Sequence, residues 1–150
     1  MKLKFLNNND NLSFYAMENS SLNKVPMFGD SVSAGFPSPA EDYLDLDLNL
    51  HDYLVQNPAA TFCVRANGDS MIDANIKSGD VMVIDRALDP TNNSIVLAVL
   101  DGEFTVKRIK KSSDELYLMP ANENYQPVKV TSDIDFQIWG VVTFIIHKAL

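Results

Sequence analysis

Residue types on which many catalytic and metal sites depend are scarce in this sequence. Its 150 residues include one cysteine, two histidines and one tryptophan. Because Cys63 is alone, no disulfide can form within the chain, which fits a reducing compartment. Two histidines and one cysteine do not compose a recognisable zinc site, and no glycine-rich phosphate loop is present. The sequence therefore predicts a protein without a bound metal or cofactor.

Long apolar runs are also missing. None approaches the ~20 residues that a helix needs to span a bilayer. The N-terminal stretch MKLKFLNNNDNL contains no sustained apolar segment of the kind found in signal peptides. We therefore predict a cytoplasmic protein that does not associate with membranes.

Positive charge is in the minority. The 12 lysine and arginine residues are outnumbered by 20 aspartate and glutamate residues, which gives a formal net charge of -8. This balance argues against a protein that binds nucleic acid by neutralising phosphates. One basic cluster comprises Lys107, Arg108, Lys110 and Lys111, and its last three members are interpreted as a solvated strand end. We therefore predict no direct, specific DNA binding.

The chain divides by pattern into an arm and a domain. Residues 1–33 are rich in Asn and Ser, show no sustained hydrophobic period and are predicted to form a weakly ordered, flexible arm. The stretch SAGFPSPAEDY contains a glycine and prolines that favour an extended, exposed path. A short helix is expected within DLNLHDYLVQNP, capped by Asp47 or Asn49 and ended by Asn57-Pro58.

Residues 61–146 have the pattern of short strands. They are rich in β-branched and aromatic residues and are divided by turn sequences such as Asn67-Gly68 and Asp101-Gly102. The second turn predicts a tight hairpin. The predicted strands are TFCVRA, DVMVID, SIVLAVLD, EFTVKRI, ELYLMP and FQIWGVVTFII. Many short strands with one clear helix predict a mostly-β domain, either a barrel or two packed sheets.

Most candidate catalytic side chains have a plain structural interpretation. Cys63 lies in an apolar strand, where cysteine is usually a buried small hydrophobe. His51 and His147 have no motif around them, and a cysteine nucleophile would require a histidine base. The acidic run EDYLDLDLNLHD is interpreted as a solvated face. One stretch, RANGDSMIDANIKSGDVMVID, is left to consider.

Ser70 is the candidate nucleophile in that stretch, because it follows a predicted strand and a Gly-Asp turn. Such a position can hold a hydroxyl clear of the sheet. The backbone N–H groups of Ser70 and Met71 can then point at a developing oxyanion. Taken alone, the motif does not separate a nucleophile from a serine that caps a turn.

Lys107 is the candidate base, on the same face of its predicted strand as Thr105. A lysine acts as a base only when it is neutral, and its ordinary pKa is about 10.4. Burial against apolar walls can lower that pKa by ~3–5 units, and bringing it near 7 costs about 4–5 kcal/mol. The pattern by itself leaves a solvated edge lysine as the alternative.

Five stretches of the sequence keep the order and spacing of one known family. They are SAGFPSPAEDY, VRANGDSMIDANIKSGDVMVIDRA, LDGEFTVKRIK, LMPANENYQPV and GVVTFIIHK. From about Val25 to the C-terminus the chain resembles the UmuD proteins, which are members of the LexA-type self-cleaving peptidases. The resemblance implies a LexA/UmuD-type peptidase domain, mostly β, that forms a homodimer.

The resemblance also implies a reaction and its residues. It makes Ser70 of the G-D-S-M motif the nucleophile and Lys107 of the E-F-T-V-K motif the general base. The substrate would be the chain's own Ala34–Gly35 bond. Residues 1–34 would then be an arm removed by self-cleavage, and residues 35–150 the peptidase and dimerisation domain.

The biological setting that the resemblance implies is the SOS response to DNA damage. Self-cleavage in this family is stimulated by a RecA filament on single-stranded DNA. The processed form would be the accessory subunit of an error-prone translesion DNA polymerase, with a UmuC-type partner.

Two other functions are left open by the sequence. In the first, the chain is a non-catalytic interaction subunit in which Ser70 and Lys107 are relics. The second is a LexA-like transcriptional regulator, which is disfavoured because residues 1–34 are too few for a helix-turn-helix domain and carry no excess positive charge. Residues 1–24 show little similarity to the family, and the segment before the bond is longer than in the best-known UmuD proteins.

Overall fold

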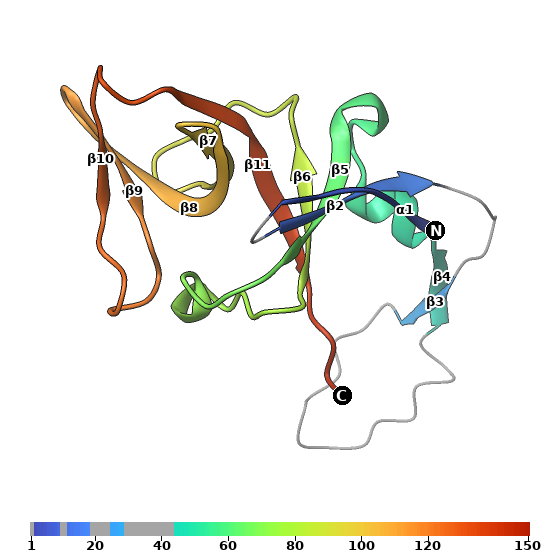
Figure 1. The fold of residues 1–150 in the computed structure, drawn as a ribbon. Helices are drawn as coiled ribbons and strands as arrows, with labels where there is room; N and C mark the ends of the chain where they lie inside the picture. Colours follow the sequence, from blue (N-terminus) through green and yellow to red (C-terminus); the bar gives the residue numbers. More distant parts are fainter. Residues whose placement is uncertain (1, 10–11, 19–24, 29–43) are drawn as a thin grey trace.

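The computed structural model describes residues 2–9, 12–18, 25–28 and 44–150 of the chain. Within these residues, antiparallel strands form a nine-stranded sheet in the order β1-β2-β5-β6-β11-β7-β8-β9-β10, and β3 pairs with β4 separately. Figure 1 shows that the large sheet is strongly curved, with β8, β9 and β10 at one side and the β1–β2 hairpin at the other. The mostly-β prediction is confirmed, but the described sheet is open, with β1 and β10 at its edges, and is not a closed barrel.

All six strands predicted within residues 61–146 are present. They are β5 (Thr61–Ala66), β6 (Val81–Asp85), β7 (Ile95–Leu100), β8 (Glu103–Ser112), β9 (Glu115–Met119) and β11 (Phe136–Ile146). The sequence did not predict β10 (Val128–Val130), whose three residues are too few for alternation to be recognised. β-Branched and aromatic residues between turn sequences therefore located the strands, including β6, in which all five residues are buried.

The hairpin between β7 and β8 has the turn that its sequence predicted. Its two central residues, Asp101 and Gly102, both have positive φ, at 48° and 82°. A turn of this kind matches the twist of the flanking strands, and glycine adopts the conformation without strain. The register that follows pairs Leu100 with Glu103 and places Lys107 opposite Val96.

The predicted helix is confirmed as α1 (Leu50–Leu54), which is shorter than expected. Asn49 caps it, with its side-chain Oδ1 accepting the N–H of Asp52 at 3.3 Å. Asp47, the alternative cap, instead belongs to strand β4 (Leu44–Leu48). Two short 3-10 helices follow, η2 (Pro58–Ala60) and η3 (Ile72–Ala74). None of the helices in the described residues is long and apolar enough to cross a membrane.

The N-terminal segment differs from its prediction, since every part of residues 1–33 that the structure describes is a strand. These strands are β1 (Lys2–Asn9), β2 (Leu12–Glu18) and β3 (Val25–Phe28). β2 pairs with β1 on one side and with β5 on the other, where Leu12 lies opposite Ala66 and Ala16 opposite Phe62. Local composition did not predict these strands, because pairing of β2 with β5 and of β3 with β4 depends on residues that lie later in the chain.

The centre of the sheet is tightly packed. Val64, Met82 and Leu97 have no exposed surface and belong to one buried cluster that spans β5, β6 and β7. β11 fits against β6 because residue 140 is glycine: a Cβ there would lie 2.6 Å from Cγ2 of Ile84. This core is the rigid base on which the candidate site is built.

Candidate functional site

Ser70 lies just beyond the end of β5, after a tight turn. Gly68 in that turn has a φ of 107°, a conformation that side chains other than glycine rarely adopt. The chain then passes through Ser70 and Met71 into the short helix η3. The predicted arrangement of strand, turn and serine is therefore present.

A loop after β9 holds this turn in place. The N–H of Ala121 donates to the carbonyl oxygen of Ser70 at 2.8 Å, and Asn122 Nδ2 donates to the Asp69 carbonyl at 2.9 Å. The hydroxyl of Tyr125 donates to Asp69 Oδ1 at 2.7 Å, and this hydrogen bond raises the pKa of Tyr125, so the phenol stays protonated as the donor. The contacts of Asn122 and Tyr125 with the turn were not predicted from the sequence, because the tertiary fold brings these distant residues together.

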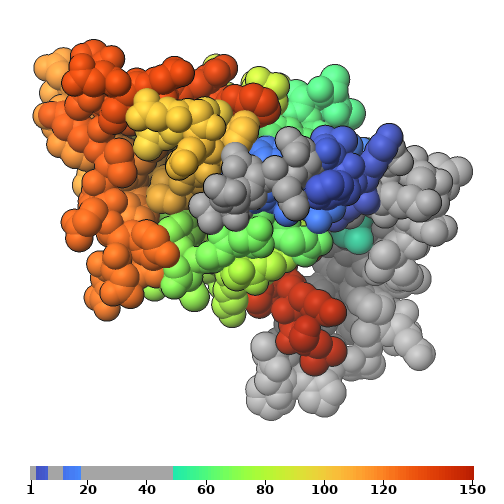
Figure 2. All heavy atoms as spheres, viewed as in Figure 1, coloured from blue at the N-terminus to red at the C-terminus, as the bar shows by residue number. Residues whose placement is uncertain are grey.

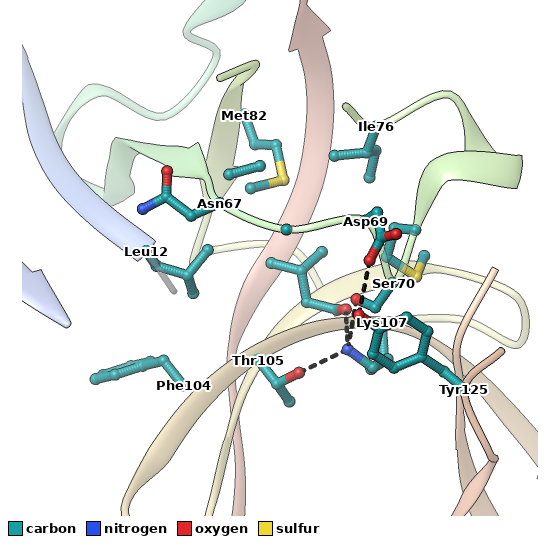
Figure 3. Close-up of a pocket in the computed structure, with 14 residues that line it drawn as sticks. Leu12, Asn67, Asp69, Ser70, Ile76, Met82, Phe104, Thr105, Lys107 and Tyr125 are labelled. Atoms are coloured by element: carbon teal, nitrogen blue, oxygen red, sulfur yellow. Dashed lines mark hydrogen bonds between the residues drawn. The ribbon is translucent and has the colours of Figure 1, made fainter. Parts of the chain in front are cut away.

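The structure brings Lys107 to Ser70, although the two are separated by 37 residues. Lys107 extends from β8, and its Nζ lies 3.0 Å from Ser70 Oγ. The same Nζ lies 2.8 Å from Thr105 Oγ1 and 3.0 Å from the carbonyl oxygen of Val106. Figure 3 shows the amine between the hydroxyl groups of Ser70 and Thr105. Thr105 was predicted to share the face of Lys107, but its contact with the amine was not foreseen.

The surroundings of Lys107 favour a neutral amine. Burial lowers its pKa below the ordinary value, and no carboxylate among the described residues pairs with Nζ to oppose that shift. A neutral amine has two N–H donors and one lone pair. The Val106 carbonyl and the Thr105 hydroxyl can accept the two donors, which leaves the lone pair for the Ser70 hydroxyl proton. The three oxygen partners can therefore satisfy the uncharged amine as well as the three donors of the ammonium, and burial is what favours the uncharged form.

Two backbone donors lie beside the serine. Within the described part of the chain, the N–H groups of Ser70 and Met71 have no hydrogen-bond partner, while the next N–H, of Ile72, donates to the Asp69 carbonyl at 3.1 Å. Unpaired N–H groups at a turn next to a hydroxyl are the donors that a developing oxyanion needs.

Ser70 and Lys107 face a pocket of about 160 Å³. Its walls include Met71, Met82 and Val106, which also belong to the buried cluster of the sheet, so part of the pocket that Lys107 faces is apolar. Figure 3 shows Leu12 and Phe104 at one end of the pocket, away from the Ser70–Lys107 contact. The packed core thereby supplies the burial that lowers the lysine pKa.

The predicted cleavage bond, Ala34–Gly35, lies outside the described residues. The strands on either side of it, β3 and β4, are described and pair in antiparallel fashion, with Phe28 opposite Leu44. The bond therefore belongs to the connection between two paired strands.

The other candidate side chains are engaged elsewhere. Cys63 has no exposed surface, and burial raises the pKa of its thiol to about 12, so it is the buried hydrophobe that was predicted. His147 Nδ1 lies 2.9 Å from Oδ1 of Asp80, whose side chain is buried, and neither residue lines the pocket. Neither residue contributes to the Ser70–Lys107 site.

Comparison with known proteins identifies the family. The Peptidase S24-like family model matches residues 26–143. Protein SamA from Salmonella typhimurium is 48% identical over 124 residues, which is 83% of this chain and 86% of SamA. Protein MucA from Escherichia coli is 43% identical over 125 residues, 83% of this chain and 85% of MucA. LexA repressor 1 from Xanthomonas campestris pv. campestris is 38% identical over 124 residues, 83% of this chain and 61% of the repressor.

The region matched by the family model contains both halves of the site, the turn with Ser70 and the strand with Lys107. It also begins within β3, so it excludes the β1–β2 hairpin. The chain therefore belongs to the Peptidase S24-like family, as a self-cleaving serine peptidase of the UmuD type with a role in SOS mutagenesis.

Proposed function

We propose that this chain cleaves its own Ala34–Gly35 bond, with Ser70 as the nucleophile and Lys107 as the general base. The observation that carries the proposal is the 3.0 Å contact between Lys107 Nζ and Ser70 Oγ, at a place where burial lowers the lysine pKa. A serine hydroxyl is a weak nucleophile until a neighbouring base takes its proton. The neutral amine of Lys107 is that base.

The reaction follows from this arrangement. Ser70 Oγ attacks the carbonyl carbon of Ala34 while its proton passes to Lys107 Nζ. The carbonyl oxygen becomes an oxyanion, and the N–H groups of Ser70 and Met71 donate hydrogen bonds to it. The protonated amine then gives its proton to the nitrogen of Gly35 as the C–N bond breaks. Water, deprotonated by Lys107, hydrolyses the resulting ester and regenerates the Ser70 hydroxyl.

Small residues on both sides of the bond suit this attack. Gly35 has no Cβ and Ala34 has only a methyl group, so the extended chain can lie close to the serine. Pro37 and Pro39 keep the following residues extended.

The test is to incubate the purified chain with RecA, ATP and single-stranded DNA, or alone at alkaline pH, and to measure product masses. We expect a fragment of residues 35–150 whose N-terminus reads GFPSP. Alkali removes the proton from Lys107 without help from RecA.

Three variants decide the residue assignment. Ser70→Ala and Lys107→Ala should remain folded and uncut. Lys110→Ala is the matched control, because Lys110 is an exposed lysine on the same strand, and it should cleave at the wild-type rate. Cleavage of either of the first two variants at the same bond would show that the dyad is assigned wrongly.

We also propose what the processed form does. Residues 35–150, as a homodimer, act as the accessory subunit of an error-prone translesion DNA polymerase with a UmuC-type partner, and a RecA filament on single-stranded DNA stimulates the cleavage that produces them. The support is the 42–48% identity to SamA, MucA and ImpA over 82–83% of the chain.

Co-purification separates this function from its alternatives. The processed form should bind a UmuC-type subunit and should not retard operator DNA. Retardation of operator DNA without such binding would favour a LexA-like regulator. Binding by a chain that is never cut would favour a non-catalytic interaction subunit.

A further inference from the structure

The β1–β2 hairpin is built into the sheet of the peptidase domain, although it precedes the residues that the family model matches. Five consecutive residues of β2, from Leu12 to Ala16, pair with β5 from Ala66 to Phe62. β1 then covers the outer side of β2. Figure 2 shows the blue hairpin lying directly above the green residues of the β5 region. The hairpin therefore occupies the edge that β5 would otherwise expose.

Apolar side chains fix the hairpin on that edge. Leu12 is 5% exposed and Phe14 is 9% exposed, and both belong to the buried cluster of the sheet. The ring of Phe14 stacks on Phe62 with centroids 6.1 Å apart and meets the edge of Phe104 at 4.9 Å. Pairs of aromatic rings in these geometries stabilise a contact beyond the area that they bury.

The hairpin also reaches the candidate active site. Leu12 lines the same pocket as Ser70 and Lys107, at the end where Phe104 lies. Without β2, the backbone N–H and C=O groups on one edge of β5 would be unpaired. Phe62 and Phe104 would lose their contacts with the ring of Phe14. An uncovered apolar edge of this kind attracts other strands and promotes aggregation.

Cutting the Ala34–Gly35 bond breaks none of these contacts. The bond lies between the two strands in sequence: the paired residues of β2 (Leu12–Ala16) precede it and those of β5 (Phe62–Ala66) follow it. The cross-strand pairs and the buried ring of Phe14 that stabilise β2 in the sheet are non-covalent contacts, and none of them involves the cleaved bond.

We propose that β2, with β1 on its outer side, remains docked on β5 after self-cleavage, so that the processed protein is a complex of two chains, 1–34 and 35–150. In this complex β2 continues to seal the sheet edge and Leu12 continues to form a wall of the pocket. This inference rests on the proposed cleavage at Ala34–Gly35.

The experiment compares native and denaturing mass spectra of one self-cleaved sample. The full chain is cleaved at alkaline pH and returned to neutral pH. Denaturing conditions should show the two fragments, and native conditions should show a species whose mass, for each protomer of the homodimer, is that of the full chain plus one water. Residues 35–150 without the fragment under native conditions would overturn the inference. Absence of fragments under denaturing conditions would instead refute the proposed function.

Paired variants test the contacts themselves. Phe14→Asp should cause complete loss of the fragment from the native complex. Leu6→Asp is the matched control, because Leu6 lies on β1 of the same hairpin and is 56% exposed, and it should keep the complex. Retention of the fragment by Phe14→Asp would show that the predicted anchor is wrong.

Hydrogen exchange tests docking without any cleavage. In the full chain with Ser70→Ala, adding Phe14→Asp should speed amide exchange in β5 (Thr61–Ala66) by about tenfold or more, because exchange follows local opening. Adding Leu6→Asp should leave it unchanged. Equal exchange in both double variants would mean that the hairpin does not protect β5. If the Phe14→Asp variant does not fold, the native mass spectrum of the self-cleaved wild type still shows whether the N-terminal fragment stays bound to residues 35–150.

Discussion

Replacing Thr105 by valine should shift the pH dependence of self-cleavage toward lower pH. The change keeps the shape of the side chain and removes only the hydroxyl, which lies 2.8 Å from Lys107 Nζ. A hydrogen bond to a charged partner is worth ~1.5–3 kcal/mol, and one between neutral groups ~0.5–1.5 kcal/mol. The Thr105 hydroxyl therefore stabilises the protonated amine more than the neutral amine.

The size of the shift follows from that difference. A loss of about 1–1.5 kcal/mol from the charged form lowers the lysine pKa by about one further unit, at ~1.36 kcal/mol per unit. At a pH below the midpoint, the neutral fraction of Lys107 then rises about tenfold. A weaker base transfers the proton less readily, so we expect cleavage at neutral pH to be faster by a factor of about 2 to 10.

The assay is the initial rate of appearance of residues 35–150, without RecA, at a series of pH values. The midpoint for Thr105→Val should lie about one unit below that of the wild type. Thr131→Val, at an exposed threonine outside the pocket, should leave the midpoint unchanged. A midpoint that stays in place while the maximal rate falls would refute the charge argument and would mean that Thr105 only positions the amine.

Three further predictions concern stability. Gly140→Ala should lower the free energy of unfolding by about 1–3 kcal/mol in urea titrations, because the new Cβ would lie 2.6 Å from Cγ2 of Ile84; an unchanged midpoint would contradict this packing. Burial opposes the charge of Asp80, but a hydrogen bond from a backbone N–H and the pair with His147 lower the pKa of Asp80 overall. The contribution of the ionised Asp80 to the stability of the fold is therefore present at neutral pH and is lost as the pH falls through that lowered pKa. Asp80→Asn should therefore melt at a lower temperature at pH 7, and the difference from the wild type should shrink in acid. The lowered pKa of Lys107 means that the wild type gains stability as the pH rises from that value toward about 10.4. Lys107→Met should therefore be more stable than the wild type at pH 7, with an advantage that decreases toward pH 10; a constant advantage would show that burial does not perturb the amine.

The sequence was sufficient to predict the strands that carry the site. Alternating apolar residues marked β5 and β8, and Asp101-Gly102 marked the turn that sets the register of Lys107. These features are local, because one buried face and one tight turn are enough to specify them. The position of Ser70 after a turn could be predicted for the same reason.

The features that the sequence could not show depend on contacts between distant segments. The Asn-rich sequence of residues 7–11 did not indicate the β1–β2 hairpin, whose place in the sheet is set by pairing with β5 about 50 residues later in the chain. The bond from Tyr125 to Asp69 spans 56 residues, so no spacing rule indicates it. The burial of Lys107 likewise depends on packing in the folded protein, which no property of its own strand reveals.

β11 supplies the backbone pairing between the two groups of strands that position the reacting side chains. In the sheet, β11 lies between β6 and β7, and it joins the strands that lead to Ser70 to the strands that carry Lys107. Of all the described strands, β11 is the last to be synthesised. A chain that lacks β11 therefore has no backbone pairing between these two groups of strands, and the contacts of the Ser70 turn with the loop after β9 are left to hold serine and lysine together.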